Sequence, residues 1–201
     1  MNISIIFTIA ACVAMLCMFI YYERNNLSIK YISLIASLSS IAGLSRIPFT
    51  ALPNIQPATF IIIISGYVFG PATGFMIGAF SVLVSNSILG HGLWTLWQMT
   101  AWGLAGFSAG ILGKFYIKPN KIIIGLFAFA WGFLFGWIIN IWYWATFVEP
   151  LNIATFLSTI AASFYFDLLH ASGNFIFTFI FGKDLIGIIN RVKNKIAVHV
   201  K

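Results

Sequence analysis

Apolar stretches of about 20 residues recur along the whole chain, and they constrain its fold more than any other feature. A helix that crosses a bilayer needs about 20 mostly apolar residues. Of the 201 residues, 61% are hydrophobic and 7% are charged, whereas soluble domains average about 45–50% and about 25%. The sequence therefore predicts an all-α, polytopic membrane helix bundle with no room for a sizeable soluble domain.

Breaks between the apolar stretches mark the expected helices. Three prolines between residues 48 and 57 cannot continue a regular helix, and Gly70 with Pro71 interrupts a later run. Residues 57–89 fit either two antiparallel helices or one kinked re-entrant hairpin, and we expect two helices. The expected spans are residues 3–22, 31–47, 59–69, 72–89, 97–112, 122–144 and 153–181, followed by a basic amphipathic tail.

The distribution of Lys and Arg predicts the orientation of these seven helices, because cytoplasmic loops are enriched in basic residues. When the loops alternate between the two sides, all of the eleven Lys and Arg except Arg46 fall on one side. We therefore expect the amino terminus outside and the carboxyl terminus in the cytoplasm. The net charge of +7 follows from this asymmetry and does not indicate a nucleic-acid partner.

Polar and aromatic side chains concentrate in residues 91–98 (HGLWTLWQ), on the predicted outer side. Trp at this depth is typical of an interfacial aromatic belt, which accounts for any single indole there. Indole faces beside His91 and Gln98 favour a ligand-binding role for the cluster as a whole.

Several polar residues fall inside the expected spans, where they usually face the bundle interior or a pathway. They are Asn86, Asn140, Asp167, His170 and Asn174. Asp167, His170 and Asn174 are spaced i, i+3 and i+7, so they share one face of the last helix. This polar stripe is either hydrogen-bonding glue between helices, with Asp167 paired to His170 or to another helix, or the polar floor of a ligand pocket or a coupling element.

Small residues at four-residue spacing form a further pattern. They are Gly66, Gly70, Gly74 and Gly78, then Gly106 with Gly110, Ala36 with Ser40, and Ser39 with Gly43. This spacing lets helix backbones approach closely. It predicts internal packing first, and docking of a partner membrane protein second.

Several catalytic and metal-binding patterns are absent from the sequence. It has no phosphate-binding P-loop, no His-Glu-x-x-His and no Gly-x-Ser-x-Gly. Cys12 and Cys17 are five residues apart on different helix faces, which excludes a disulfide framework or a thiolate metal site. We expect no catalytic residue, no metal site and no cofactor, and if the protein transports a substrate, a partner supplies the energy.

A set of motifs follows one another between residues 31 and 195. They are residues 46–57 (RIPFTALPNIQP), 66–71 (GYVFGP), 74–78 (GFMIG), 94–98 (WTLWQ) and 167–174 (DLLHASGN), with 181–183 (FGK) after them. In order and spacing they resemble the substrate-binding S component of energy-coupling factor (ECF) vitamin transporters. The resemblance implies a six-helix core that captures a vitamin or related micronutrient outside a bacterial cell, and that docks on a transmembrane coupling protein driven by two cytoplasmic ATPase subunits.

The resemblance also divides the chain and implies roles for its residues. Residues 1–30 are an extra N-terminal transmembrane helix with its loop, 31–183 are the six-helix core, and 184–201 are a basic cytoplasmic tail. The substrate-binding residues that it implies are Asn54, Gln56, Asn86, His91, Trp94, Trp97 and Gln98. The docking face for the coupling protein that it implies is Ala36, Ser39, Ser40 and Gly43. Ala10 and Ala14, on the extra helix, match the family's Ala-x-x-x-Ala pattern better. The resemblance therefore leaves two candidate docking surfaces, residues 36–43 and the extra helix.

The substrate is not fixed by these residues. Overall likeness to the family favours cobalamin or a related corrinoid, with riboflavin or another B-type vitamin as the alternative. A membrane-embedded enzyme that uses Asp167 and His170 as an acid–base pair is a rival function, and a scaffold without a ligand is another. We expect a transporter subunit rather than an enzyme.

Overall fold

The computed structural model describes residues 3–24 and 29–198. This part of the chain contains seven α-helices, one short 3₁₀ helix and no strand. The helices are α1 (Ile3–Glu23), α2 (Ile29–Leu44), α3 (Ala58–Phe69), α4 (Pro71–Leu89), α5 (Trp94–Phe115), α6 (Lys121–Phe147) and α7 (Ile153–Val198), with η1 (Ile47–Phe49) after α2. The predicted all-α bundle is confirmed. Residues 25–28 of the first predicted loop and 199–201 of the predicted tail lie outside the described residues.

The helix breaks follow the local chemistry of Gly and Pro. α2 ends at Leu44, three residues before the predicted end, and the chain continues through a turn into the 3₁₀ helix η1, with Pro48 in its first turn, where a missing N–H is tolerated. Residues 57–89 form two helices, as expected. They part at Gly70, whose φ of +95° is rarely adopted by a residue with a Cβ. Pro71 then occupies the first turn of α4, where its missing N–H costs nothing.

Glycines hold α3, α4 and α5 in direct backbone contact. A Cβ added at Gly74 of α4 would lie 2.7 Å from the Cα of Gly66 in α3, and one added at Gly66 would lie 3.1 Å from the Cα of Gly106 in α5. Further along, Gly78 faces the main chain of Trp102. We call these residues, together with Gly110 against Gly70 and Pro71, the glycine seam. The small-residue pattern of these three helices therefore serves internal packing.

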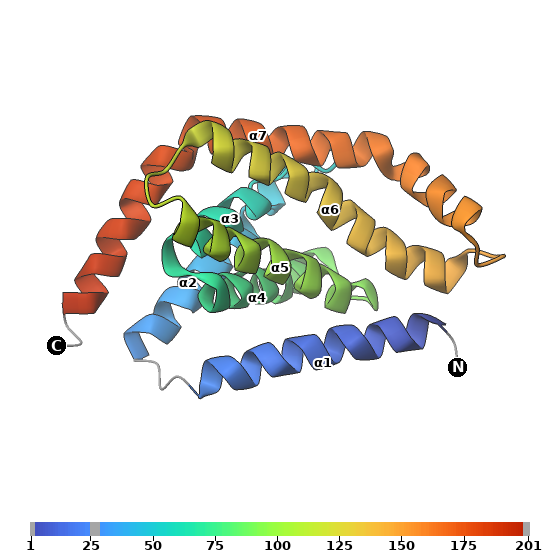
Figure 1. Cartoon of the computed structure of the whole chain (residues 1–201), viewed down its shortest axis with the longest axis horizontal. Helices are drawn as coiled ribbons and strands as arrows, with labels where there is room; N and C mark the ends of the chain where they lie inside the picture. The colour runs from blue at the N-terminus through green and yellow to red at the C-terminus, as the bar shows by residue number, and fades with distance from the viewer. Residues whose placement is uncertain (1–2, 25–28, 199–201) are drawn as a thin grey trace.

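The remaining helices cover this centre from different sides. α6 and α7 run side by side along one side of the bundle, and α1 lies along the opposite side (Figure 1). α1 contacts α4, α5 and α6. Its Met15 is buried, and the ring of Phe19 packs 5.6 Å from that of Phe80 in α4.

The last helix continues beyond the expected span into the predicted amphipathic tail. α7 does not end near residue 181 but continues to Val198, bending so that its last part passes across one end of the bundle (Figure 1). Ile186 and Ile189 are buried there, and the Nζ of Lys193 donates a 2.6 Å hydrogen bond to the carbonyl of Val68 at the end of α3. The apolar run ends at residue 181, but Lys and Arg are good helix formers, so the helix itself does not end.

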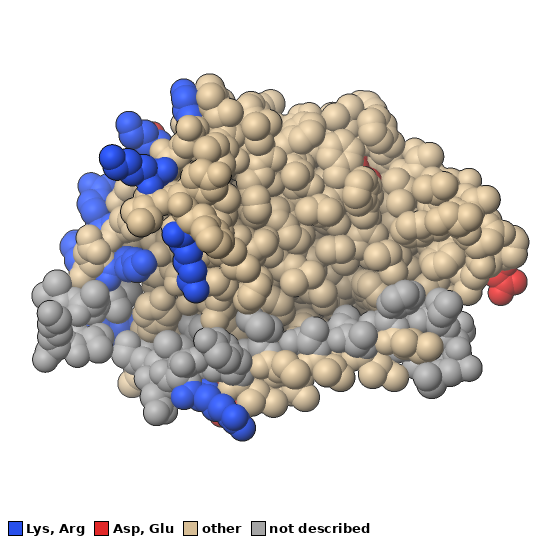
Figure 2. Space-filling view, in the orientation of Figure 1, with Lys and Arg blue, Asp and Glu red and all other residues tan. Residues whose placement is uncertain are grey.

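Lys and Arg side chains gather at the end of the molecule that the last part of α7 crosses (Figure 2). We call it the basic end, and the opposite end, where α4, α6 and η1 finish, the loop end. On length and composition, three helical segments can cross a membrane: Ile29–Phe49, Pro71–Leu89 and Lys121–Phe147. α3, with 12 residues that are all buried, lies inside the bundle. The orientation and the division at residues 31 and 183 stay predictions.

Candidate functional site

Arg46 is the centre of a polar network at the loop end. It follows the end of α2 and is half-buried. Its Nε donates a 2.7 Å hydrogen bond to the Oε1 of Gln56, and its Nη1 donates to the Oγ of Ser85 at 2.7 Å and the Oδ1 of Asn86 at 3.2 Å. The loop after α2 is thereby tied to the last turns of α4. None of these acceptors is a carboxylate, so these contacts leave the positive charge of the guanidinium uncompensated.

Asn86 extends the network to the start of α5. This side chain is buried, and its Nδ2 donates to the Oε1 of Gln98 at 2.8 Å and to the Oγ1 of Thr95 at 3.2 Å. A buried amide needs such partners, because an unpaired one costs free energy. We define the Arg46 network as Arg46, Gln56, Ser85, Asn86, Thr95 and Gln98.

An aromatic and hydroxyl chain leads from this network into the bundle. The guanidinium of Arg46 lies 4.9 Å from the ring centroid of Trp102, a cation–π distance. The indole Nε1 of Trp102 donates to the Oγ1 of Thr59 at 2.9 Å, and that hydroxyl is 2.8 Å from the Nε2 of His170. Phe135 packs edge-on against the imidazole, with 5.2 Å between ring centroids. Residues of four helices thus meet at one buried point.

Two atoms at the inner end of this chain of contacts are buried and have no hydrogen-bond partner among the described residues. They are the Nδ1 of His170 and the Oδ1 of Asn174. The Nδ2 of Asn174 donates to the carbonyl of Ala128 at 3.3 Å, so this side chain joins α7 to α6. Buried polar atoms are usually paired, and an exception needs an explanation. These two atoms have spare hydrogen-bonding capacity for a polar ligand.

Asp167, the third residue of the polar stripe, has different partners. Its Oδ2 accepts a 2.8 Å hydrogen bond from Ser163, whose Oγ also accepts one of 2.7 Å from the Nδ2 of Asn140. All three stripe residues are buried. Asp167 therefore pairs within its own helix and, through Ser163, with α6, while His170 pairs with α3.

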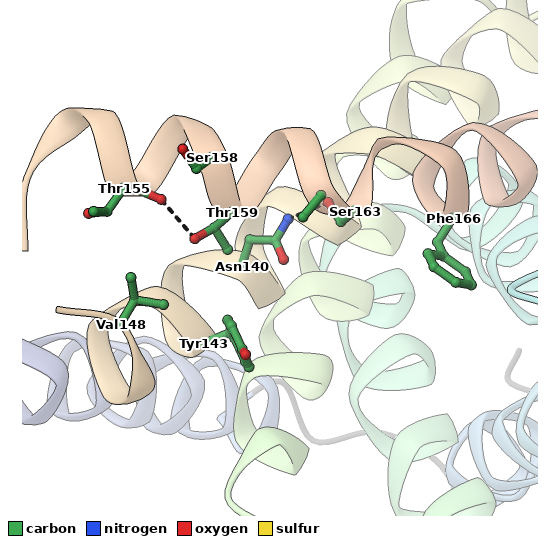
Figure 3. Close-up of a pocket in the computed structure, with 9 residues that line it drawn as sticks. Asn140, Tyr143, Val148, Thr155, Ser158, Thr159, Ser163 and Phe166 are labelled. Atoms are coloured by element: carbon green, nitrogen blue, oxygen red, sulfur yellow. Dashed lines mark hydrogen bonds between the residues drawn. The ribbon is translucent and has the colours of Figure 1, made fainter.

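A cavity of about 540 Å³ lies between α6 and α7 beside Asn140 and Ser163. The hydroxyls and the amide of its wall come from both helices, and the hydroxyl of Thr159 donates to the carbonyl of Thr155 (Figure 3). Phe166 closes one end of it. This cavity was not predicted, because single hydroxyls on apolar helices form no recognisable motif in the sequence.

The predicted binding residues separate into two groups in the structure. Gln56, Asn86 and Gln98 belong to the Arg46 network. The other four lie outside it: Trp97 is buried, and His91 is exposed. Trp94 is partly exposed, with its ring 6.2 Å from that of Trp142. The side chain of Asn54 donates to the carbonyl of Phe166 at 3.0 Å. Asn54 therefore fastens the loop to α7, and Trp94 lies at the rim between α5 and α6.

Arg46, Thr59 and Trp102 belong to the site but were not among the predicted site residues. A signal for Arg46 existed, because it is the one basic residue predicted on the outer side, where nothing in the topology requires a charge. Thr59 and Trp102 gave no signal, because either residue is ordinary in an apolar helix.

The predicted docking residues of α2 also divide. Gly43 and Ser39 are buried against α4, where the Oγ of Ser39 donates to the carbonyl of Ile77 at 3.3 Å. Ser39 also lines a groove of about 690 Å³ between α2 and α4, together with Ala36 and Ser40, and Glu23 of α1 reaches the same groove. Docking at this surface stays a prediction.

Among the described residues, no group of three or more His, Cys, Asp or Glu could hold a metal ion. The site consists instead of one guanidinium, several amides and hydroxyls, and indole faces, inside an apolar bundle. These are groups that bind an organic molecule by hydrogen bonds and stacking. Fold and site together define a multi-pass membrane protein with a polar site inside one end of its helix bundle.

The comparison with protein families agrees with this class. The chain belongs to the family of ECF-type riboflavin transporter S components, whose profile matches residues 23–191. Over 107 residues it is 28% identical to UPF0397 proteins of Aliivibrio fischeri strains MJ11 and ATCC 700601 / ES114. The aligned part covers 51% of this chain and 57% of each relative, so the chain spans little more than half the length of these curated relatives. No solved structure matches it.

Proposed function

We propose that this protein is the substrate-binding subunit of an ECF-type uptake transporter, and that the Arg46 network forms the polar wall of its substrate site. The observation that carries the proposal is the half-buried guanidinium of Arg46, which has amide and hydroxyl partners but no carboxylate partner among the described residues. A guanidinium held in this way favours donating to a further acceptor, because a buried charge is stabilised by additional hydrogen bonds. Carbonyl oxygens or an anionic group of a bound molecule would provide one.

The surrounding groups suit a flat, polar-edged ring. Amides of Gln56 and Gln98 offer donors and acceptors beside Arg46, and the Nδ1 of His170 has spare capacity deeper in the bundle. The indole of Trp94 offers a flat apolar face at the rim. The loop of residues 46–57, fastened to α7 by Asn54, would cover the ligand.

Riboflavin is the first substrate to test, because its isoalloxazine ring is flat and carries carbonyl groups on one edge, and because the family is described by that vitamin. Cobalamin, which the overall likeness of the sequence favoured, stays a prediction. It is far larger than a flavin, so it would require the loop of residues 46–57 to open further.

A coupling protein and two ATPase subunits would be the partners, as in the family. The groove beside Ala36 and Ser40 is the docking surface that we propose for the coupling protein, because small residues and an apolar wall let another helix approach closely. The asymmetry of Lys and Arg supports placing this basic end in the cytoplasm and the loop end outside.

An enzymatic function has less support. An acid–base pair would need Asp167 and His170 to act on a common group, but their hydrogen bonds lead to Ser163 and to Thr59, in different directions.

A direct binding experiment tests the proposal. The detergent-purified protein is titrated with riboflavin, whose fluorescence is quenched when its ring stacks on indole, and a thermal-shift panel adds cobalamin, thiamine, biotin, folate and pyridoxal. A ligand at 100 times its Kd stabilises the folded state by about 2.7 kcal/mol. Replacement of Arg46 by Gln should weaken binding about 10- to 150-fold, the equivalent of one hydrogen bond to a charged group.

The matched control is Arg24→Gln, which removes the same charge from an exposed position after α1. It should bind as the unmodified protein does. If no vitamin binds, or if Arg46→Gln binds as tightly as the control while both remain folded by circular dichroism, the proposed site is wrong.

A further inference from the structure

A second cavity lies at the basic end, away from the Arg46 network. Its volume is about 530 Å³, and it opens between the start of α6 and the bend of α7. Lys118, Lys121 and Lys183 line it, one from the loop before α6, one from the first residue of α6 and one from α7. Residues distant in sequence therefore bring three ammonium groups to one hollow.

The walls of this cavity have two different characters. Beside the lysines, Asn120 caps α6 by accepting hydrogen bonds from the N–H groups of Ile122 and Ile123, so the positive end of the α6 dipole also points at the cavity. The inner wall is apolar and is formed by isoleucines that are almost completely buried: Ile64, Ile124 and Ile186. A purely ionic ligand would gain nothing from that wall.

Among the described residues, no acidic side chain lines the cavity. Asp184 follows Lys183 in sequence but is not among the residues that line the cavity. The ammonium group of Lys121 lies 4.0 Å from the ring centroid of Phe179, which holds it by a cation–π contact and leaves its charge uncompensated. The cavity is therefore electropositive, and its natural ligand is an anion.

The last part of α7 sets the depth of this cavity in the bilayer. After the bend, Ile186 and Ile189 face the bundle, while Ile188 and Val192 stay exposed beside Arg191. A helix with apolar and basic faces that crosses the end of a membrane bundle lies in the plane of the lipid headgroups. The mouth of the cavity, next to that segment, is then at headgroup level.

We propose that this cavity binds the headgroup of an anionic phospholipid of the surrounding bilayer. The phosphate lies among Lys118, Lys121 and Lys183, and the glycerol and the first acyl carbons lie against the isoleucine wall. Basic pockets between helices on the cytoplasmic side are suited to such headgroups. The inference rests on the membrane location of the family and does not depend on the proposed substrate.

Native mass spectrometry of the delipidated protein in detergent tests the proposal. Phosphatidylglycerol and phosphatidylcholine of equal chain length are added in equal amounts, and the bound fraction of each is measured. The unmodified protein should prefer phosphatidylglycerol. Each lysine near the surface contributes about fivefold in affinity, so the triple variant Lys118→Gln, Lys121→Gln, Lys183→Gln should lose about a hundredfold of that preference.

The matched control removes three positive charges outside the cavity and outside the last part of α7: Arg24→Gln, Lys30→Gln and Lys114→Gln. It should keep the preference for phosphatidylglycerol. The single variant Lys183→Gln, expected to lose about fivefold, provides the test if the triple variant fails to fold.

Three outcomes would overturn the proposal. One is an equal loss of the phosphatidylglycerol preference in the control variant, which would show that the preference depends on net charge and not on this cavity. Another is displacement of the lipid by inorganic phosphate at equal concentration, which would make the cavity a site for a free anion. The third is an unchanged lipid preference in the triple variant with weaker binding of the coupling protein, which would make this face a protein interface.

Discussion

The glycine seam allows a sharp prediction about stability, for the substitution Gly106→Ala. A Cβ at this position would lie 2.5 Å from the carbonyl carbon of Gly74 and 3.1 Å from its Cα, and closer still to its carbonyl oxygen. Carbon atoms in ordinary contact are about 3.5–4.0 Å apart, so α4 and α5 would have to separate by about 1 Å. The obstacle is backbone, which cannot rotate away as a side chain does.

The expected change in the free energy of unfolding for Gly106→Ala is the difference of two effects. Overpacking of a tight interface costs about 1–3 kcal/mol, and we take the upper value because Gly66 of α3 contacts the same residue. Replacement of Gly by Ala in a helix contributes about 1 kcal/mol in the opposite direction. Gly106→Ala should therefore lower the free energy of unfolding by about 2 kcal/mol.

Gly187→Ala is the matched control, since it makes the same chemical change in α7 at a position where an added Cβ meets nothing within 4 Å. It should stabilise the protein by up to about 1 kcal/mol. Unfolding by sodium dodecyl sulfate, followed by far-UV circular dichroism in mild detergent, measures both variants. If Gly106→Ala unfolds at the same or a higher denaturant concentration than Gly187→Ala, the backbones of α4 and α5 are not in contact and the reasoning fails.

The remaining predictions concern single hydrogen bonds. Lys193→Met, which removes the bond to the Val68 carbonyl, should cost about 1.5–3 kcal/mol in the same unfolding assay and expose the last part of α7 to a protease. Asn120→Ala, which removes the cap of α6, should lower the free energy of unfolding by about 0.5–2 kcal/mol, and Asn120→Ser should keep most of that free energy. Equal stability of the Ala and Ser variants would contradict the capping role. Trp102→Phe keeps the ring but removes the donor to Thr59, so it should cost about 1 kcal/mol, and no loss in thermal unfolding would count against that bond.

The sequence predicted most of the helices because their breaks depend on local chemistry. Gly70 with Pro71 and the prolines of the loop restrict the backbone at their own positions, whatever the rest of the chain does. The expected last span followed the apolar run to residue 181, and that run did not indicate that the same helix continues through the basic tail to Val198. Hydropathy reports where a helix can contact lipid, while helix propensity decides where it ends, and the two differ for a basic amphipathic segment.

The candidate site was harder to predict, because its contacts join distant segments. Arg46 is 39 residues from Ser85 and 40 from Asn86, and Thr59 is 111 residues from His170. A periodicity within one helix can place Asp167, His170 and Asn174 on one face, but it cannot tell which helix that face meets. The amides of the site were recognised from residue type alone, and their partners required the fold.

The glycine seam also decides which parts of the protein are free to rearrange. Where backbone touches backbone, there are no side-chain rotamers to change, so α3, α4 and α5 can move only together as one rigid block. The α6–α7 pair is fastened to this block mainly by side chains, among them His170 to Thr59 and Lys193 to Val68. A motion of this pair against the block would have to break or keep these two bonds of α7, whereas opening of the loop of residues 46–57 would leave both in place.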